Sequence, residues 1–250
     1  MTNGVSIKGK VCLVTGSNRS IGLAILEALV EKGAKKVYAA VRNLETAIPL
    51  ASKYDTVVPL HLDLSDPKSI QEAAKSASDV EIVVNNAGVL SRTFPLADNA
   101  IDELQTEMNI NVYGLMHIAR EFVPVLKQNG GGVLVQLNSV GSIRCSAPSV
   151  STYCASKHAS FAMTQALRME LKQQNTLVVS VHPGPIMTDM LSTSPDVSSL
   201  EPEDPKVVGE AICQSIEAGE FLCYPDKKAK SLGKAYAGYA DHVFEKGNSY

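Results

Sequence analysis

Two residues suited to proton transfer stand four positions apart in the segment Tyr153-Cys154-Ala155-Ser156-Lys157. Residues at this spacing share one face of a helix, so a helix here would bring the lysine ammonium beside the tyrosine phenol. A neighbouring positive charge stabilises phenolate and lowers the phenol pKa from its usual value of about 10. The pair could then donate and accept a proton near neutral pH. The same two residue types also occur at this spacing on ordinary exposed helix faces.

A glycine-containing stretch near the amino terminus has the residue types of a phosphate-binding turn. It follows the apolar run Val11–Thr15, which predicts a buried strand, and it leads into a predicted helix at Ile21–Glu31. The free N–H groups at a helix start, with its positive dipole end, favour a pyrophosphate. We expect a dinucleotide to contact Gly16, Ser17, Asn18, Arg19, Ser20, Ile21 and Gly22. The spacing differs from the usual G-x-G-x-x-G, so a plain strand-to-helix turn stays open on this pattern alone.

Arginines rather than carboxylates stand where such folds select between the two nicotinamide cofactors. An acidic residue after the second strand accepts the ribose hydroxyls of NAD, whereas an arginine there suits the 2′-phosphate of NADP. The predicted strand Lys36–Val41 is followed by Arg42, and Arg19 could reach the same phosphate. A guanidinium pairs with a phosphate through two parallel hydrogen bonds. The sequence therefore favours NADP(H). The alternative is that Arg42 is a solvated residue at the strand end.

These residues need a scaffold that brings the ends of several strands together. Apolar runs alternate with helical patterns along the chain, and the runs are apolar throughout. We predict strands at Val11–Thr15, Lys36–Val41, Val57–Leu62, Glu81–Val84, Val133–Leu137 and Leu177–Val181. This order predicts an α/β protein with a Rossmann fold, a doubly wound parallel sheet of about seven strands with helices on both faces. Ligands of such folds bind beyond the carboxyl ends of the strands.

The length and composition agree with one domain of this kind. The chain has 250 residues, of which 45% are hydrophobic and 20% are charged, and these proportions exclude a disordered chain or a coiled coil. We expect a single domain over residues 1–250 with a substrate loop at about 185–205. The helical pattern from Ile101 to Gln128 should break near Asn109–Gly114, and a last helix is expected around Ala235–Phe244.

Charge and cysteine usage exclude several other classes. The net charge of −3 suggests no nucleic-acid or membrane footprint. The sequence has no run of about 18 apolar residues and no apolar leader, so neither a membrane span nor a secretory signal is expected. The five cysteines have no paired spacing, which favours thiols in a reducing cytoplasm over disulfides or zinc ligands. We expect a cytoplasmic protein without a metal site.

Five segments, taken in order, resemble the motifs of the short-chain dehydrogenase/reductase family. The first turn resembles its Thr-Gly-x-x-x-Gly-x-Gly, with Ser20 in place of the middle glycine. Asn85-Asn86-Ala87-Gly88 matches a second motif, and Asn111 to Gly114 resembles the family's Asn-x-x-Gly. The Tyr153–Lys157 pair and the segment Pro183–Thr188, which resembles Pro-Gly-x-x-x-Thr, complete the set. The resemblance covers roughly Lys10 to Met190 and implies an NADP-preferring carbonyl reductase.

The resemblance also implies roles for particular residues. Ser139 and Tyr153 would hold a carbonyl oxygen, Lys157 would assist the tyrosine, and Asn111 would hold a water that returns the proton. Ser139 is preferred to Ser142 as the catalytic serine because it takes the first position of the family's Ser-x-x-Gly-like turn. Further cofactor contacts are implied for Asp63, Leu64, Asn85, Ala87, Gly88, Tyr153, Lys157, Pro183, Ile186 and Thr188.

The expected substrate is a small carbonyl compound or alcohol with mostly apolar contacts. We expect its pocket to be lined by Phe94, Ser142, Cys145, Met187, Met190 and Leu191, together with Leu90 and Pro148. Arg92 and Arg144 could lie at the rim and receive an anion, although rim arginines are more often solvated. The resemblance implies a homodimer or homotetramer, joined through the long helices after the fourth and fifth strands.

Three other functions stay open on the sequence. The first is an NAD-preferring alcohol dehydrogenase of the same family. The second is a non-catalytic NADP-sensing protein on the same fold, which would be expected to lack Tyr153 or Lys157. The third is a sugar-nucleotide epimerase or dehydratase, which keeps the tyrosine and lysine but usually has a larger carboxyl-terminal domain.

Overall fold

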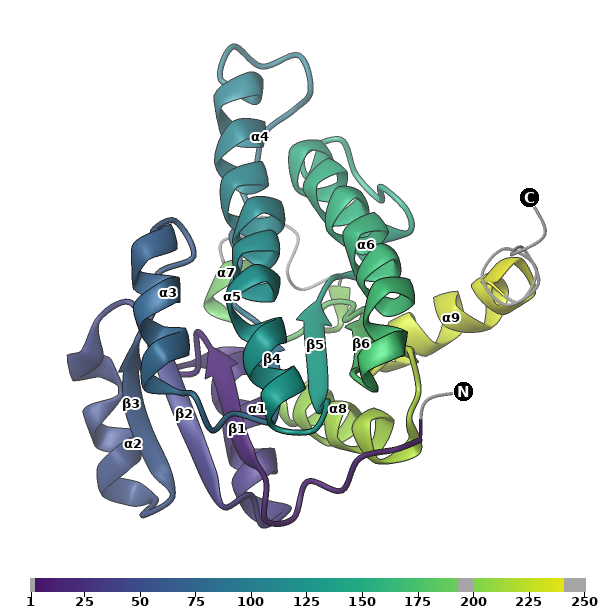
Figure 1. The fold of residues 1–250 in the computed structure, drawn as a ribbon. Coiled ribbons are helices and arrows are strands. Elements are labelled where there is room, and N and C mark those ends of the chain that lie inside the picture. The colour runs from purple at the N-terminus through teal and green to yellow at the C-terminus, as the bar shows by residue number, and fades with distance from the viewer. Residues whose placement is uncertain (1–2, 193–199, 241–250) are drawn as a thin grey trace.

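A parallel sheet forms the centre of the molecule (Figure 1). The structure is a computed structural model that describes residues 3–192 and 200–240. The strands in these ranges are β1 (Val11–Thr15), β2 (Lys36–Val41), β3 (Val57–His61), β4 (Ile82–Asn85), β5 (Val133–Leu137), β6 (Leu177–Val181) and β7 (Leu222–Cys223). They pair in the order β3-β2-β1-β4-β5-β6-β7, and every pair is parallel. The strand order reverses between β1 and β4, and α/β sheets bind ligands outside this switch point.

Helices cover both faces of the sheet. The α-helices in the described ranges are α1 (Ser20–Glu31), α2 (Ile48–Lys53), α3 (Pro67–Ser76), α4 (Ala100–Met108), α5 (Gly114–Gln128), α6 (Ser151–Leu171), α7 (Asp189–Ser192), α8 (Lys206–Ala218) and α9 (Lys227–Ala240). Short 3₁₀ turns lie at Leu44–Thr46, Val140–Ser142 and Lys172–Gln174. Buried side chains of α1, α2 and α8 pack on one face of the sheet, and those of α3, α5 and α6 pack on the other. Figure 1 shows the sheet between these two layers.

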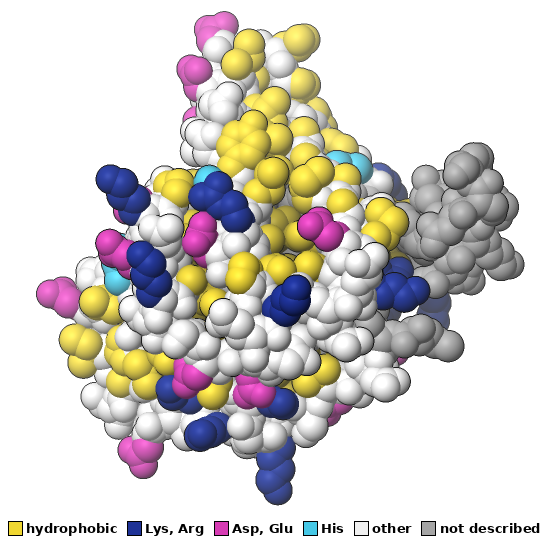
Figure 2. All heavy atoms as spheres, in the orientation of Figure 1, with side chains coloured by type: hydrophobic (Ala, Val, Ile, Leu, Met, Phe, Trp, Pro, Cys, Tyr) yellow, Lys and Arg dark blue, Asp and Glu magenta, His cyan; other side chains and the backbone are white. Residues whose placement is uncertain are grey.

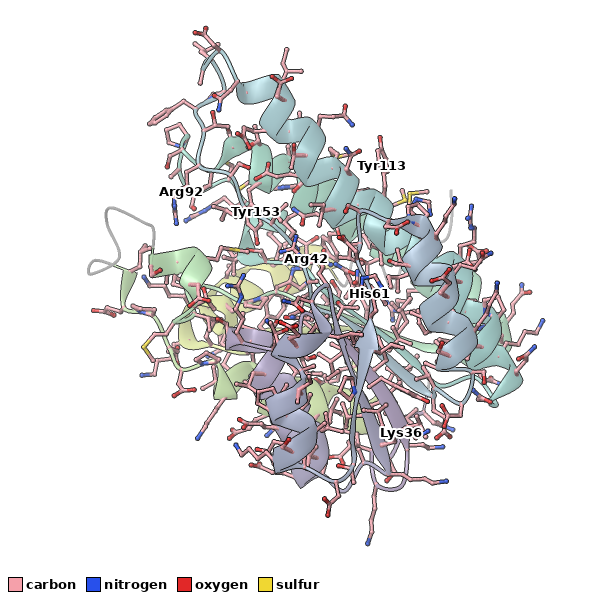
Figure 3. The ribbon with its side chains drawn as sticks, turned by 90° about the vertical axis from the view of Figure 1, so that its left-hand side faces the viewer. Lys36, Arg42, His61, Arg92, Tyr113 and Tyr153 are labelled. Carbon is pink, nitrogen blue, oxygen red and sulfur yellow. The ribbon has the colours of Figure 1, made fainter. Side chains whose placement is uncertain are left out.

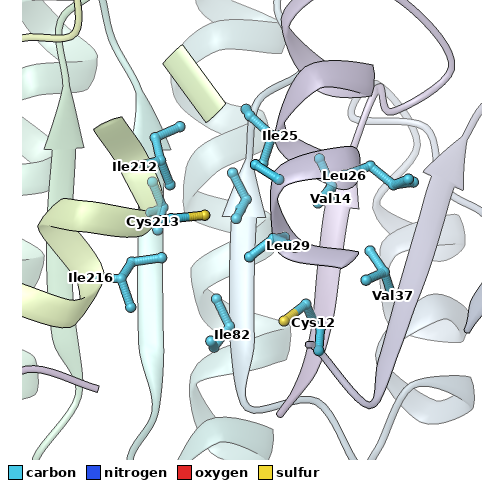
Figure 4. Packing of buried hydrophobic residues seen from close by; sticks show 14 of the residues in the cluster. Cys12, Val14, Ile25, Leu26, Leu29, Val37, Ile82, Ile212, Cys213 and Ile216 are labelled. Carbon is cyan, nitrogen blue, oxygen red and sulfur yellow. The ribbon is translucent and has the colours of Figure 1, made fainter. Parts of the chain in front are cut away.

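Alternate residues of each strand contribute to the two helical layers. In β1, Cys12 and Val14 belong to the core on the α1 side, whereas Val11 and Leu13 belong to the core on the α5 side. Figure 4 shows side chains of α1 and α8 packed against the first of these faces. Because water reaches neither face, both sets of positions are apolar, and this produces the uninterrupted apolar runs of the sequence. Each large side chain buried in this way stabilises the fold by about 1.5–3 kcal/mol.

The predicted doubly wound fold is confirmed. The first six strands lie within one residue of their predicted bounds at each end. The predicted break in the long helix is a π-helical turn at Asn109–Tyr113, which joins α4 to α5. Such turns place an extra residue in one turn of a helix and are frequent at functional sites.

The carboxyl-terminal helix begins earlier than the sequence predicts. Asp226 caps α9, since its Oδ1 accepts a hydrogen bond from the backbone N–H of Ala229 at 2.9 Å, so the helix starts at Lys227 instead of near Ala235. The predicted helix end at Phe244 and residues 193–199 of the predicted substrate loop lie outside the described residues. In the described parts of the chain, no helix is long and apolar enough to cross a membrane.

Candidate active site

A cavity of about 530 Å³ lies beyond the carboxyl ends of the central strands, as the fold predicts. The structure brings to this cavity most of the residues that the sequence assigns to the site. Those that line it are Gly16, Asn18, Arg19, Ser20, Ile21, Gly22, Arg42, Asp63, Leu64, Ala87, Gly88, Ser139, Tyr153, Lys157, Pro183, Ile186, Thr188, Met190 and Leu191. Residues from widely separated parts of the chain therefore share one site.

The turn after β1 is tightly packed against α1. Gly16 has a φ of +64°, in the left-handed region that glycine adopts without strain. A Cβ atom on Gly22 would lie 2.1 Å from the Gly16 carbonyl oxygen, so only glycine lets the helix approach the turn so closely. Ser20 also has a positive φ, of 48°. That conformation costs a non-glycine residue roughly 1–2 kcal/mol, so the departure from the family's glycine introduces local strain.

Two predicted cofactor contacts, Ser17 and Asn85, do not line the cavity. Ser17 is fully buried, and Asn85 is 1% exposed. Asn85 links three strands, because it accepts a hydrogen bond from Thr15 Oγ1 at 3.2 Å and donates to Gln136 Oε1 at 2.8 Å. The next residue, Asn86, lines the cavity and donates from Nδ2 to the Thr15 carbonyl oxygen at 2.8 Å. Successive side chains of extended backbone point to opposite sides. Asn86 therefore faces the cavity in place of the predicted Asn85.

The two arginines expected at a phosphate reach the cavity from different segments. Arg42 is exposed and follows β2, as Figure 3 shows, and Arg19 forms an ion pair with Asp189 of α7 at 3.2 Å. Burial acts to raise the pKa of Asp63, but hydrogen bonds from Ser65 and the charge of Arg42 outweigh it and lower that pKa. The Asp63 carboxylate accepts from Ser65 N at 2.9 Å and from its Oγ at 2.7 Å.

The residues with proton-transfer chemistry meet between β5 and α6. Ser139 follows β5 in an extended conformation, and its Oγ accepts a hydrogen bond from Gly141 N at 3.0 Å. Tyr153 and Lys157 lie in the first two turns of α6. The Lys157 Nζ is 5.8 Å from the centre of the Tyr153 ring and donates to the Leu137 carbonyl oxygen at 2.7 Å.

Burial dominates the protonation of the Tyr153–Lys157 pair. Burial raises the pKa of Tyr153 to about 12, although a hydrogen bond with the Ser139 hydroxyl acts to lower it. Burial also lowers the pKa of Lys157 to about 8, although the negative charge of Glu107 acts to raise it. The structure therefore does not show the lowered tyrosine pKa that the sequence predicts, because burial of the phenol raises this pKa. At neutral pH the phenol keeps its proton, which is the form that can donate.

Asn111 lies in the π-helical turn and is almost fully buried. Its Oδ1 accepts from Val89 N at 3.0 Å, and its Nδ2 donates to the Val89 carbonyl oxygen at 2.9 Å and to Ser156 Oγ at 3.0 Å. These bonds use the side-chain amide and fix the segment after β4 against α6. Asn111 does not itself line the cavity, so a water held by this residue stays a prediction.

A buried chain of hydrogen bonds lies beside Ser139. Asn138 Nδ2 donates to Ser180 Oγ at 2.9 Å, and Ser180 Oγ lies 2.8 Å from His182 Nε2. On the other side of the ring, Nδ1 lies 2.9 Å from Ser142 Oγ, and that hydroxyl donates to the Ser139 carbonyl oxygen. Since Ser142 donates its single hydroxyl proton to the Ser139 carbonyl oxygen, Nδ1 carries the ring proton and donates to Ser142 Oγ, and Nε2 accepts from Ser180 Oγ. His182 thus supports the turn that carries Ser139.

Burial lowers the pKa of His182 to about 4 from 6.5. Below pH 6.5 the unfolded chain binds a proton that the folded chain accepts only near pH 4, so stability falls as the pH falls through this interval. We expect a loss of roughly 2 kcal/mol between about pH 7 and pH 5 from this residue. Urea unfolding at both pH values should show a smaller loss for His182→Gln than for the wild type. His158→Gln, at an exposed histidine, is the control, and equal pH dependence in all three proteins would contradict the assignment.

The turn after β6 is held by the carboxyl-terminal part of the chain. Gly184 N–H donates to Asp226 Oδ2 at 2.6 Å, and Asp226 is 1% exposed. A Cβ on Gly184 would lie 2.6 Å from Asp226 Oδ1, so this contact requires glycine. One carboxylate therefore caps α9 and fixes the segment that carries Pro183 and Ile186 into the cavity. No spacing in the sequence connects these two regions.

Four of the six predicted substrate contacts lie outside the cavity lining. Ser142 is buried in the chain of hydrogen bonds described above. Phe94 and Met187 are 58% and 50% exposed. Cys145 is also exposed, with its Sγ 3.4 Å from the Ala147 carbonyl oxygen. The prediction for these four residues is therefore not supported, whereas Met190 and Leu191 do line the cavity.

The backbone around Met187 explains why this residue misses the cavity. Met187 N–H donates to the Glu203 carbonyl oxygen at 2.9 Å, which fixes the segment against the chain that follows the loop. The neighbouring Ile186 lines the cavity and is 3% exposed, so the next side chain along the extended backbone points outward. A shift of one residue thus decides which side chain faces the site.

The structure adds polar residues that the sequence did not assign to the site. Asn138 lines the cavity, and its Oδ1 is buried without a hydrogen-bond partner among the described residues. Glu107 of α4 is fully buried and accepts from Ser91 N–H through Oε1 at 2.6 Å, and burial raises its pKa. Arg92, considered only at the rim, lines the cavity. No group of three or more metal-ligating side chains occurs among the residues that the structure describes.

The fold and the cavity define a dinucleotide-binding protein, with Ser139, Tyr153 and Lys157 lining the cavity at the switch point of its sheet. The chain belongs to the short chain dehydrogenase family, whose model matches residues 10–197. Family membership and the Rossmann fold that the sequence predicts are thereby confirmed.

Three known proteins illustrate the similarity. An NADP-dependent 3-hydroxy acid dehydrogenase of Schizosaccharomyces pombe is 29% identical, over 96% of this chain and 98% of its own length. An NADPH-dependent aldehyde reductase-like chloroplastic protein of Arabidopsis thaliana is 32% identical, over 82% of this chain and 84% of its own. The crystal structure of a short chain dehydrogenase from Burkholderia cenocepacia in complex with NADP superposes with a TM-score of 0.84 at 31% identity, covering 97% of this chain and 98% of that one.

Proposed function

We propose that this protein is an NADPH-dependent oxidoreductase that reduces a ketone or aldehyde to an alcohol. The observation that carries the proposal is the convergence of Ser139 and Tyr153 on one cavity, with Lys157 one helical turn further on. Two hydroxyl donors suit a carbonyl oxygen on which negative charge develops during reduction. Family membership supports the oxidoreductase class, and the names of the relatives and the NADP complex support the cofactor.

The residues of the cavity fit this cofactor. The N-terminus of α1 opens at the cavity, and its N-cap residue Arg19 makes no side-chain hydrogen bond to the first turn. Backbone N–H groups there are available to a pyrophosphate. Arg42 is an exposed cation at the end of β2, where a 2′-phosphate would be recognised. Ile186 and Thr188 would orient the nicotinamide from the opposite side of the cavity.

Bound NADPH would supply the hydride, and the chain would supply the proton and the electrostatic environment. Ser139 and Tyr153 would donate hydrogen bonds to the carbonyl oxygen and hold it in one orientation. Tyr153 keeps its proton at neutral pH, because burial raises its pKa to about 12, and it would pass this proton to the forming alkoxide. Lys157 would place positive charge beside the phenolate so formed, and Asn111 with a water would return the proton.

The proposal is tested by mixing the protein with NADPH and a panel of ketones and aldehydes. The absorbance of reduced nicotinamide should fall with at least one compound, and the product should be the matching alcohol. NADH should give a much lower kcat/KM than NADPH. Tight binding of NADPH without turnover of any compound would favour the sensing protein instead.

We propose that the protein assembles as a homodimer or homotetramer in the cytoplasm, with one catalytic domain spanning residues 1–250. Figure 2 shows hydrophobic side chains gathered over the region of α4, α5 and α6. Exposed apolar residues of these helices and the turn between them are Ile101, Tyr113, Met116, Met163 and Met169. Such a patch is typical of an interface, and a second copy would cover it. Mass photometry of the purified chain would measure the assembly directly.

A further inference from the structure

Arg92 differs from the other two arginines of the cavity because no interaction with a described residue accounts for its position. Arg19 is paired with Asp189, and Arg42 lowers the pKa of Asp63 through its charge. Arg92 lines the cavity, and its Nε is buried without a hydrogen-bond partner among the described residues. A buried, unpaired guanidinium nitrogen is costly unless a ligand satisfies it.

The backbone on both sides of Arg92 is fixed. Ser91 N–H donates to the buried carboxyl of Glu107 at 2.6 Å. Thr93 forms a parallel bridge with Val150, and its carbonyl oxygen accepts from Ser151 Oγ at 3.4 Å. The arginine therefore leaves the chain between two anchors, which limits the positions that its guanidinium can take. A group held in this way binds a ligand with less loss of conformational entropy.

Arg92 also lies at the catalytic end of the cavity. The sheet order places β1 between β2, which leads to Arg42, and β4, whose following segment carries Arg92. In the view of Figure 3, Arg42 and Arg92 lie on opposite sides of Tyr153. Arg92 therefore lies on the side of Tyr153 away from Arg42, where the ribose phosphate of the proposed cofactor would bind.

Among the described residues, no carboxylate forms an ion pair with Arg92. The described carboxylates that line the cavity are Asp63 and Asp189, and both have the partners described above. Glu107 is buried behind the segment, and the charged groups that act on its pKa are Glu103 and Lys157. The other residues of the cavity lining include Leu90, Met190 and Leu191, which are apolar.

We infer that Arg92 binds a carboxylate on the substrate, so that the preferred substrate is an oxo acid with an apolar body. One guanidinium matches one carboxylate through two parallel hydrogen bonds, whereas a dianionic phosphate would call for a further cation. This inference rests on the proposed carbonyl reduction at Ser139 and Tyr153. The reduction itself is unchanged: the carbonyl carbon gains hydride from NADPH, and its oxygen gains the Tyr153 proton, which solvent replaces.

The test compares oxo acids with their methyl esters. Medium-chain 2-, 3-, 4- and 5-oxo acids and the matching esters are assayed with NADPH on the wild type, Arg92→Met and Arg92→Lys. We expect at least one acid to exceed its ester in kcat/KM by about tenfold or more, since charge-assisted pairs are about twice as strong as neutral ones. Arg92→Met should abolish this preference through KM and leave ester reduction within about threefold, and Arg92→Lys should keep part of it. Arg144→Met, at an exposed arginine outside the lining, should behave as the wild type.

Two results would overturn the inference. One is equal turnover of every acid and its ester by the wild type, and the other is an equal loss for acid and ester in Arg92→Met. Both leave carbonyl reduction intact. Binding of octanoate to the NADPH complex, measured by calorimetry, separates the two proposals further. If octanoate binding depends on Arg92 but no carbonyl compound is reduced, the carboxylate site stands and the proposed reduction fails.

Discussion

Replacing Tyr153 by phenylalanine is expected to lower kcat for carbonyl reduction by about a thousandfold, within the 10²–10⁴ range typical of a lost general acid. In the proposed mechanism, the Tyr153 phenol would touch the carbonyl oxygen, and it carries a transferable proton at neutral pH because burial raises its pKa to about 12. Phenylalanine keeps the ring and its packing on α6, so the affinity for NADPH should change by less than about threefold. Steady-state kinetics and fluorescence titration of NADPH measure the two effects separately.

Tyr113→Phe is the matched control for this variant. It removes the same hydroxyl from a tyrosine that is 45% exposed, on the π-helical turn outside the cavity lining, as Figure 3 shows. Its kcat should equal that of the wild type. If Tyr153→Phe keeps more than about a tenth of the wild-type kcat, the tyrosine is not the proton donor, because such a loss is below the typical contribution of a general acid.

Replacing Arg42 by alanine is expected to weaken NADPH binding by roughly 10–100-fold, because hydrogen bonds to charged groups contribute about 1.5–3 kcal/mol. NADH lacks the 2′-phosphate, so its dissociation constant should change by less than about threefold. Arg42 stands at the end of β2 without an ion-pair partner among the described residues, which leaves its guanidinium available to the phosphate. Fluorescence titrations of both nucleotides measure the change in selectivity.

Lys35→Ala provides the control for charge alone. Lys35 is exposed and immediately precedes β2, so this variant removes one positive charge at the opposite end of the same strand. Its affinity for both nucleotides should equal that of the wild type. An equal loss of NADPH and NADH affinity in Arg42→Ala would show that Arg42 does not read the phosphate, and NAD preference would then return as the alternative.

The position of the site was predictable because its chemistry lies at strand ends. Gly16, Ser139 and Pro183 each follow an apolar run, and the carboxyl ends of parallel strands converge on one edge of the sheet. The spacing of Tyr153 and Lys157 predicts a shared helical face, and α6 supplies it. Local patterns were thus sufficient for the fold and for most of the cavity lining.

Contacts between distant segments were beyond the reach of these patterns. Whether a side chain of the substrate region faces the cavity changes from one residue to the next. Ile186 lines the cavity, whereas the adjacent Met187 is exposed. The ion pair between Arg19 and Asp189 joins two segments that no local pattern connects. The pKa of Tyr153 depends on the burial of its phenol in the folded protein, which raises this pKa, and no local spacing predicts that burial.

Because the Asp226 carboxylate fixes the turn at Gly184, this turn can reach its final conformation only after Asp226 has been synthesised. The turn at Gly184 emerges from the ribosome before the residue that fixes it, because synthesis runs from the amino terminus. A nascent chain that ends before Asp226 would already contain β1 to β7 but would lack the anchor for the turn at Gly184. Tight cofactor binding would then arise only after Asp226 has been synthesised.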